Sequence, residues 1–166
     1  MEGIKIVRSD KTLAASFNKA VDSVARERLY LATVEGFPLE ASVDYVAYMA
    51  ENNFPQYFAV LDNEVVGWCD ITPKDIPEFS HAGVLGMGVL PGFRGKGIGK
   101  RLLEETLTHA KEITCLERVE LCVYKSNESA IELYKKTGFE IEGEEIRVRK
   151  IDGRYENEIL MAKQIH

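Results

Sequence analysis

The 166-residue sequence has few of the features that mark secreted, metal-binding or membrane proteins. Its three cysteines, Cys69, Cys115 and Cys122, form no C-x-x-C pair, which argues against a disulfide framework or a zinc cluster. They stand in apolar stretches, so we expect buried thiols in a reducing compartment. The longest uncharged apolar stretch, 82–93, is short and rich in glycine, and no basic segment followed by an apolar one opens the chain. These absences predict a cytoplasmic protein without a metal and without membrane contact.

Positive charge is also scarce, because 21 Lys and Arg stand against 27 Asp and Glu, for a formal net charge of −6. This balance argues against general attraction to nucleic acid. The charge is unevenly spread: Leu29 to Pro73 has no Lys or Arg and seven acidic residues, whereas Phe79 to Leu103 has no acidic residue. Four cations fall within residues 94–101 of that second segment. Any anion-binding site must therefore be local, and residues 94–101 are the candidate for it.

Length and a hydrophobic content of 45% indicate a single domain over residues 1–166. Alternating apolar residues predict strands at 4–8, 57–61, 65–72, 82–89, 118–124, 139–141, 146–151 and 155–161. Apolar residues at helical spacing predict helices after Ser9 or Asp10, over 39–51 with Val43, Val46, Ala47 and Ala50 inward, from Ile98 to Ile113, and from Ser126 or Asn127 to Gly138.

A glycine-rich loop joins the strand at 82–89 to the helix that begins near Ile98, and it reads Leu90-Pro91-Gly92-Phe93-Arg94-Gly95-Lys96-Gly97. The first N–H groups of a helix have no partner within the helix, and its dipole favours negative charge there, so this arrangement predicts an anion site. The glycine spacing does not fit the dinucleotide fingerprint. A P-loop fails too, because Ile98 and Gly99 stand where its Lys and hydroxyl belong.

The loop fits the pattern Arg-x-x-Gly-x-Gly, as Arg94-Gly95-Lys96-Gly97-Ile98-Gly99, and a second element follows with Asn127, Ala130, Leu133-Tyr134 and Gly138-Phe139. With both elements the sequence resembles the GNAT superfamily of acyl-CoA-dependent N-acetyltransferases. The closing segment, from Asp152-Gly153 to Met161, looks like those of bacterial small-molecule members. Together with the α/β alternation, the resemblance implies an α/β (α+β) fold with a mixed, mostly antiparallel seven-stranded sheet and helices on both faces.

The resemblance also implies the cofactor site. In the family, the signature wraps the pyrophosphate of coenzyme A, the preceding strand pairs with the pantetheine arm, and the coenzyme sits in a V-shaped gap between two strands. The residues that would bind acetyl-CoA are Met87, Gly88, Val89, Arg94, Gly95, Lys96, Gly97, Ile98, Gly99, Lys100, Asn127 and Tyr134.

Acetyl transfer to an amine needs a polarised carbonyl, a neutral amine and a proton for the departing thiolate. A backbone N–H at residues 87–89 can polarise the carbonyl, and Gly86 and Gly88 would ease a bulge there. The family position of Tyr134 makes its phenol the candidate general acid. For the general base, Glu120, Asp70 and His81 are candidates that no spacing rule separates. We take Glu120 as the predicted base. The cysteines are poor nucleophile candidates because lone cysteines in apolar strands are mostly core residues.

The acidic segment from Leu29 to Pro73 resembles the variable acceptor region of the family and favours a cationic substrate. We therefore expect acetyl transfer to a primary amine of a small molecule, amino acid or peptide N-terminus, with Tyr30, Phe37 and Trp68 as pocket walls. A non-catalytic module that senses acetyl-CoA is the alternative, although such a module would not need Tyr134. A nucleic-acid-binding domain is disfavoured by the net acidity. The oligomeric state stays open, with a homodimer among the alternatives.

Overall fold

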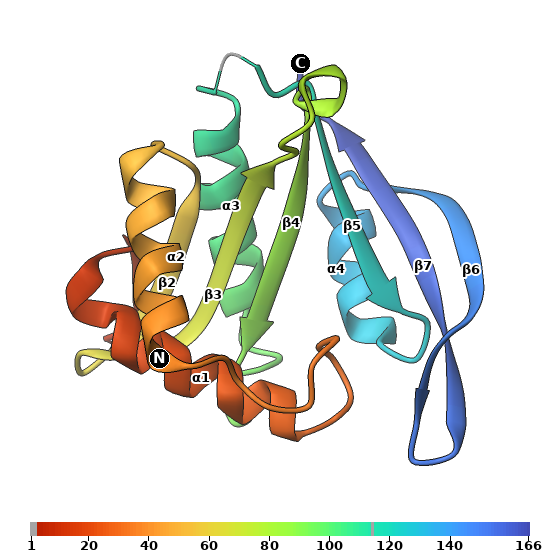
Figure 1. Ribbon diagram of the computed structural model, residues 1–166, viewed down its shortest axis with the longest axis horizontal. Coiled ribbons are helices and arrows are strands. Elements are labelled where there is room, and N and C mark those ends of the chain that lie inside the picture. The colour runs from red at the N-terminus through yellow and green to blue at the C-terminus, as the bar shows by residue number, and fades with distance from the viewer. Residues whose placement is uncertain (1–2, 114) are drawn as a thin grey trace.

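The computed structural model describes residues 3–113 and 115–166, which form a seven-stranded sheet flanked by helices (Figure 1). The strand order is β1-β2-β3-β4-β5-β7-β6. Neighbouring strands are antiparallel except for β4 and β5, so the predicted fold is confirmed. In chain order the elements are β1 (Lys5–Arg8), the short helix η1 (Lys11–Leu13), α1 (Ala14–Arg26), α2 (Leu39–Glu51), β2 (Gln56–Leu61), β3 (Glu64–Pro73), the short helix η2 (Pro77–Phe79), β4 (Ala82–Val89), α3 (Ile98–Ala110), β5 (Arg118–Tyr124), α4 (Glu128–Lys136), β6 (Glu140–Ile151) and β7 (Arg154–Gln164).

Two apolar cores lie on opposite faces of the sheet. Helices α1 and α2 cover one face, where Phe17 of α1 stacks on Phe58 of β2 and meets Trp68 of β3 edge to face. Helices α3 and α4 cover the other face, where Leu102, Leu103 and their neighbours are fully buried. Successive side chains of a strand point to opposite faces, so β3 sends Trp68 and Asp70 to the first face and Cys69 to the second.

Strands β4 and β5 part at the centre of the sheet. Within the described residues they pair only where Ala82, Gly83 and Val84 face Arg118, Val119 and Glu120. They then diverge, as Figure 1 shows, because β4 runs on into the glycine loop and α3 whereas β5 runs toward α4. The later part of β4 consequently presents an edge without a strand partner toward β5. This parting is the V-shaped gap that the sequence resemblance implied.

Our prediction of a β-bulge at Gly86 and Gly88 is wrong. The pairing of β3 with β4 runs without a register shift from Gly67 opposite Val89 to Pro73 opposite Gly83. Gly88 serves packing instead, since a Cβ there would lie 2.3 Å from the ring of Trp68. The indole can therefore pack closely against β4 only because this position has no side chain.

Four smaller expectations also need correction. The strands expected at 139–141 and 146–151 are parts of one strand, β6, which begins at Glu140 and whose pairing with β7 shifts register in two places. Helix α3 ends at Ala110, before Ile113. Helix α2 turns Met49 rather than Ala50 into the core. Cys115 and Cys122 are exposed: Val119, Leu121 and Val123 point into the core, so Cys122 must point to the other face of the sheet.

None of the helices within residues 3–113 and 115–166 is both long enough and apolar enough to cross a membrane.

Candidate active site

The glycine loop between β4 and α3 forms one wall of a cleft of about 290 Å³. Gly92, Gly95 and Gly97 have φ angles of 83°, 70° and 79°, in the left-handed region that favours glycine. A Cβ at any of the three would meet nothing within 4 Å, so the backbone conformation rather than lack of space requires glycine. Gly97 is the N-cap of α3, and within the described chain no side chain caps that end. The N–H groups of the first turn are therefore available to an anion.

The other wall of this cofactor cleft is α4. Asn127 caps α4 by accepting a hydrogen bond from the backbone N–H of Ala130, and the cleft runs between that helix start and the glycine loop. Every predicted cofactor-binding residue lines the cleft except Lys96, whose ammonium donates to the carbonyl of Gly92. The lining residues are Val24, Tyr30, Met87, Gly88, Val89, Phe93, Arg94, Gly95, Gly97, Ile98, Gly99, Lys100, Asn127, Ser129, Ala130, Leu133 and Tyr134.

Arg94 links the glycine loop to β4 and to the end of α1. Its Nε donates to the carbonyl of Val89 at 2.7 Å, and its two terminal nitrogens bind both carboxylate oxygens of Glu27, at the end of α1. The Tyr30 ring stacks on the same guanidinium at 4.6 Å. Tyr30, which we expected in the acceptor pocket, therefore lies in the cofactor cleft. Glu27 was not foreseen, because an ion pair between residues 67 positions apart leaves no local sequence signal.

Tyr134 projects from α4 into the cofactor cleft and is 6% exposed. Its ring meets Phe139 edge to face at 5.7 Å, which fixes its orientation. Burial, with a smaller contribution from nearby Cys69, raises the pKa of Tyr134 above its ordinary value of 10.0. The phenol therefore keeps its proton at neutral pH and is present in the form that can act as a proton donor.

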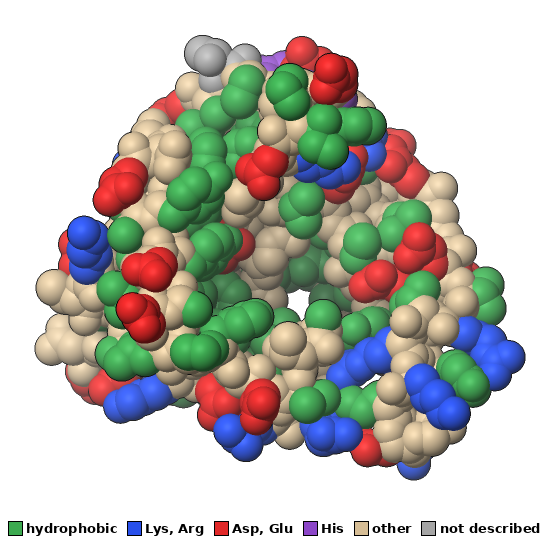
Figure 2. Space-filling view, viewed as in Figure 1, with side chains coloured by type: hydrophobic (Ala, Val, Ile, Leu, Met, Phe, Trp, Pro, Cys, Tyr) green, Lys and Arg blue, Asp and Glu red, His purple; other side chains and the backbone are tan. Residues whose placement is uncertain are grey.

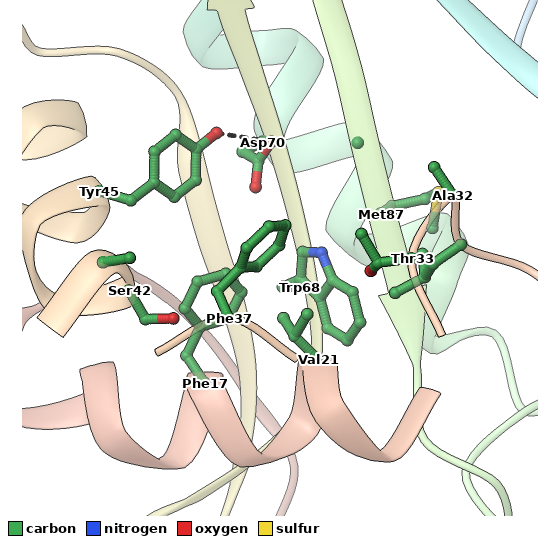
Figure 3. A pocket seen from close by; sticks show the side chains of 13 residues that line it. Phe17, Val21, Ala32, Thr33, Phe37, Ser42, Tyr45, Trp68, Asp70 and Met87 are labelled. Carbon is green, nitrogen blue, oxygen red and sulfur yellow. Dashed lines mark hydrogen bonds between the residues drawn. The ribbon is translucent and has the colours of Figure 1, made fainter. Parts of the chain in front are cut away.

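A second cavity, of about 490 Å³, opens on the face of the sheet that α1 and α2 cover (Figure 3). Met87 lines both this acceptor cavity and the cofactor cleft, so the two meet at β4. Phe37 and Trp68, both predicted as pocket walls, line the acceptor cavity. Its full lining is Phe17, Val21, Leu31, Ala32, Thr33, Phe37, Ala41, Ser42, Tyr45, Trp68, Asp70, Gly86 and Met87.

Asp70 is the one charged side chain among the described residues that line the acceptor cavity. It is 8% exposed, and Tyr45 of α2 donates a hydrogen bond to its Oδ1 at 3.1 Å, drawn as a dashed line in Figure 3. Burial raises the pKa of Asp70 to about 7, although the hydrogen bond from Tyr45 opposes that rise. A carboxyl group with this pKa can accept and release protons near neutral pH.

Glu120 and His81, the other two candidates for the base, line neither cavity. The Glu120 carboxylate is paired with Lys74 and with Arg118. Burial works against ionisation of Glu120, but these ion pairs prevail and hold its pKa below the ordinary value of 4.5. His81 is exposed in the turn before β4. The structure thus brings Asp70, but not Glu120 or His81, to the acceptor cavity.

Comparison with known proteins agrees with this geometry. Residues 23–139 match the model of the acetyltransferase (GNAT) family. The chain belongs to the GNAT family. An L-amino acid N-acetyltransferase of Escherichia coli K12 is 32% identical over 108 residues, which are 65% of this chain and 67% of that one. The spermidine N(1)-acetyltransferase of the same organism is 27% identical over 75% of this chain and 68% of its own length.

Two solved structures show the same fold. A GNAT-family acetyltransferase of Streptococcus pneumoniae superposes with a TM-score of 0.91 and 26% identity, over 98% of this chain and 99% of that one. The yncA protein of Salmonella typhimurium, solved with its cofactor acetyl-CoA, gives a TM-score of 0.91 at 17% identity, over 99% of this chain and 95% of that one. The family match and the curated relatives show that this GNAT protein is an acetyl-CoA-dependent N-acetyltransferase.

Proposed function

We propose that this GNAT protein transfers the acetyl group of acetyl-CoA to a primary amine by direct attack, with both substrates bound at once. The observation that carries the proposal is the meeting of two cavities at Met87, where β4 and β5 part. Amine and thioester can reach each other through this gap from opposite faces of the sheet. Bringing two reactants together in this way makes a covalent enzyme intermediate unnecessary.

The cofactor cleft supplies the groups that would hold acetyl-CoA. The free N–H groups at the start of α3 suit the pyrophosphate, and the unpaired edge of β4 over residues 87–89 suits the amide groups of the pantetheine arm. A backbone N–H on that edge would also polarise the thioester carbonyl. When bound, the thioester supplies an activated acyl group and a thiol leaving group.

Asp70 takes the role of general base in this proposal, in place of Glu120. It would receive the proton that the bound ammonium must lose before its nitrogen can attack. An alkylammonium has a pKa of about 10, so transfer to a carboxylate with a pKa of about 7 is uphill by about 3 pKa units, or roughly 4 kcal/mol. An ordinary carboxylate would make the same transfer uphill by about 6 units. The burial of Asp70 therefore lowers the barrier to amine deprotonation.

Tyr134 takes the role of general acid. Its phenol would protonate the thiolate as the carbon–sulfur bond breaks, and the second proton that the nitrogen loses would then replace the one Tyr134 gave. In water a phenol with a pKa of about 10 is a weaker acid than a thiol with a pKa of about 8.5, so this transfer is uphill by about 1.5 pKa units, and by more where burial raises the pKa of Tyr134. The second nitrogen proton, which restores the phenol, draws the transfer forward. Ammonium, acetyl-CoA and enzyme thus yield amide, thiol and one released proton.

The test is the release of free thiol from acetyl-CoA across a panel of monoamines, polyamines, amino acids, aminoglycosides and short peptides, beside calorimetry with acetyl-CoA. We expect heat of binding and amine-dependent thiol release with at least one class. Binding of acetyl-CoA without thiol release from any amine would instead identify a non-catalytic module that senses the coenzyme. No heat with any acyl form would contradict the assignment of the cofactor cleft.

A further inference from the structure

The acceptor cavity contains one negative charge and, among its described lining residues, no positive one. Nine of the 13 lining residues come from the segment Leu29 to Pro73, in which the chain has no Lys or Arg. The remaining four, Phe17, Val21, Gly86 and Met87, are uncharged. Figure 3 shows the Phe37 and Trp68 rings beside Asp70, so the space next to this carboxylate is apolar. A cation can be neutralised here, but an anion cannot.

Asp70 is also placed to hold the ammonium end of a substrate. Its Oδ1 and the hydroxyl of Thr72 both lie 3.1 Å from the Tyr45 hydroxyl, so the carboxylate is fixed by a small polar cluster. It faces Gly86 across the β3–β4 pair, one residue from Met87, where the two cavities meet. An amine nitrogen bound at Asp70 would therefore sit beside the gap that leads to the thioester.

We infer that the acceptor is a primary amine whose amine-bearing carbon carries an apolar group and no carboxylate. This inference rests on the proposed function and narrows its substrate class. The carboxylate of a free α-amino acid is bonded to the carbon that carries its nitrogen, so it would lie within about 4 Å of Asp70. Two carboxylates that close in an apolar cavity repel strongly, and no cation in the lining offsets the loss of hydration.

Cations elsewhere in the molecule do not supply the missing partner. Lys and Arg side chains gather on the β6–β7 hairpin, at the lower right of Figure 2, from strand segments that include Arg147, Arg149 and Arg154. None of these three lines the acceptor cavity. The start of α2 does border the cavity, but its first turn already carries Glu40, whose charge opposes an incoming anion there. The cavity therefore selects against substrates with a carboxylate beside the amine.

A matched substrate series tests the inference with the wild-type enzyme: 2-phenylethylamine, phenylalaninamide and phenylalanine. Phenylalaninamide has nearly the size of phenylalanine without its negative charge, so it separates charge from bulk. With kcat/KM expressed per ammonium form of each amine, we expect the first two to agree within about tenfold and phenylalanine to be at least a hundredfold poorer. Phenylalanine equal to or better than phenylalaninamide would overturn the inference and leave the proposed acetyltransfer intact. If no amine of any class gave thiol release, both the inference and the proposed acetyl transfer would be overturned.

A substitution at the exposed Ala32, which lines the cavity near Met87 in Figure 3, gives a second readout. Ala32→Lys would place a cation where the lining has none, and we expect it to raise the rate with phenylalanine relative to phenylalaninamide by about tenfold. Ala32→Gln has a similar length without the charge, and it should leave that ratio near the wild-type value. An equal change of the ratio in both variants, or no change in the Lys variant, would contradict the charge argument.

Discussion

The two cavities that meet at Met87 are built from different kinds of group. The cofactor cleft relies on backbone: the first N–H groups of α3, the unpaired edge of β4, and three glycines with positive φ between them. The acceptor cavity relies on side chains: Asp70 on β3, Tyr45 on α2 and aromatic walls from several elements. A site made of backbone keeps its ligand when side chains change, whereas a site made of side chains can change its ligand with one substitution. The two sites should therefore respond to substitution in separable ways.

Tyr134 is the side chain in the cofactor cleft from which we expect the largest effect. Tyr134→Phe should lower kcat by roughly a hundred- to ten-thousandfold, because the thiolate would lose its proton donor. The affinity for acetyl-CoA should change little, since the backbone contacts stay. Single-turnover rates and calorimetry would measure the two quantities separately.

Tyr30→Phe is the matched control, because it also removes one phenol oxygen from the same cleft while keeping the ring that stacks on Arg94. We expect its kcat to stay within about threefold of wild type. Turnover at the wild-type rate in Tyr134→Phe would remove the general-acid role from Tyr134.

The acceptor cavity should respond at Asp70. Asp70→Asn keeps the size and removes the base, so we expect kcat/KM for the amine to fall by about a hundredfold. In the wild type, kcat/KM should rise with pH through about 7, as Asp70 loses its proton, and this limb should vanish in the variant. Besides Asp70, the ionisable side chain of this cluster is the Tyr45 phenol, whose pKa burial raises far above that range. The Cys69 thiol on the opposite face of the sheet also has a pKa that burial raises far above it.

Glu120→Gln is the control for the base, because Glu120 is the sequence-based candidate and lines neither cavity. We expect its kcat/KM to remain within about twofold of wild type and to keep the rise near pH 7. The reverse pattern, with loss in the Glu120 variant and none in the Asp70 variant, would return the base role to Glu120.

A smaller effect is expected where a side chain supports the backbone site. Glu27→Gln would weaken the pair that holds Arg94 against the glycine loop, a partly exposed ion pair that should contribute about 1 kcal/mol. The KM for acetyl-CoA should rise about fivefold while kcat stays unchanged. Glu132→Gln breaks an exposed pair with Lys135 on α4 and should change neither constant. A fall in kcat without a rise in KM would show that Glu27 does more than position the loop.

The difference between a cofactor cleft built from backbone and an acceptor cavity built from side chains explains how much of the site the sequence predicts. The cofactor cleft is local: one strand, loop and helix over residues 82–110 provide most of it, and glycine spacing is visible in a sequence. The acceptor cavity joins residues that are far apart, as Tyr45 and Asp70 are 25 positions apart. The sequence does not show which side chains surround an acidic residue in an apolar strand, so it could not decide between Asp70 and Glu120 as the general base. Tyr30 was misplaced because the position of a loop residue depends on what it packs against, here Arg94.

The last predicted effect concerns stability rather than catalysis, and it has the opposite sign to the effect on catalysis. The pKa of Asp70 lies near 7 in the folded protein, above its ordinary value of 3.8, so the folded state holds this proton more tightly than the unfolded chain. Folding stability should therefore fall as pH rises from about 4 to about 7, and stay level above that range as far as Asp70 is concerned. Asp70→Asn removes the ionisation, so the Tm advantage of the variant over the wild type should be larger at pH 8 than at pH 5. The linkage between these pH values amounts to about 2.6 kcal/mol, and at about 2–4 °C per kcal/mol for a chain of this size the difference should be roughly 5–10 °C. Thermal unfolding at the two pH values measures the difference, and an equal gap at both would mean that Asp70 ionises as easily in the folded protein as in water. A less active but more stable variant would show that the buried carboxylate is kept for its chemistry, at a cost to the fold.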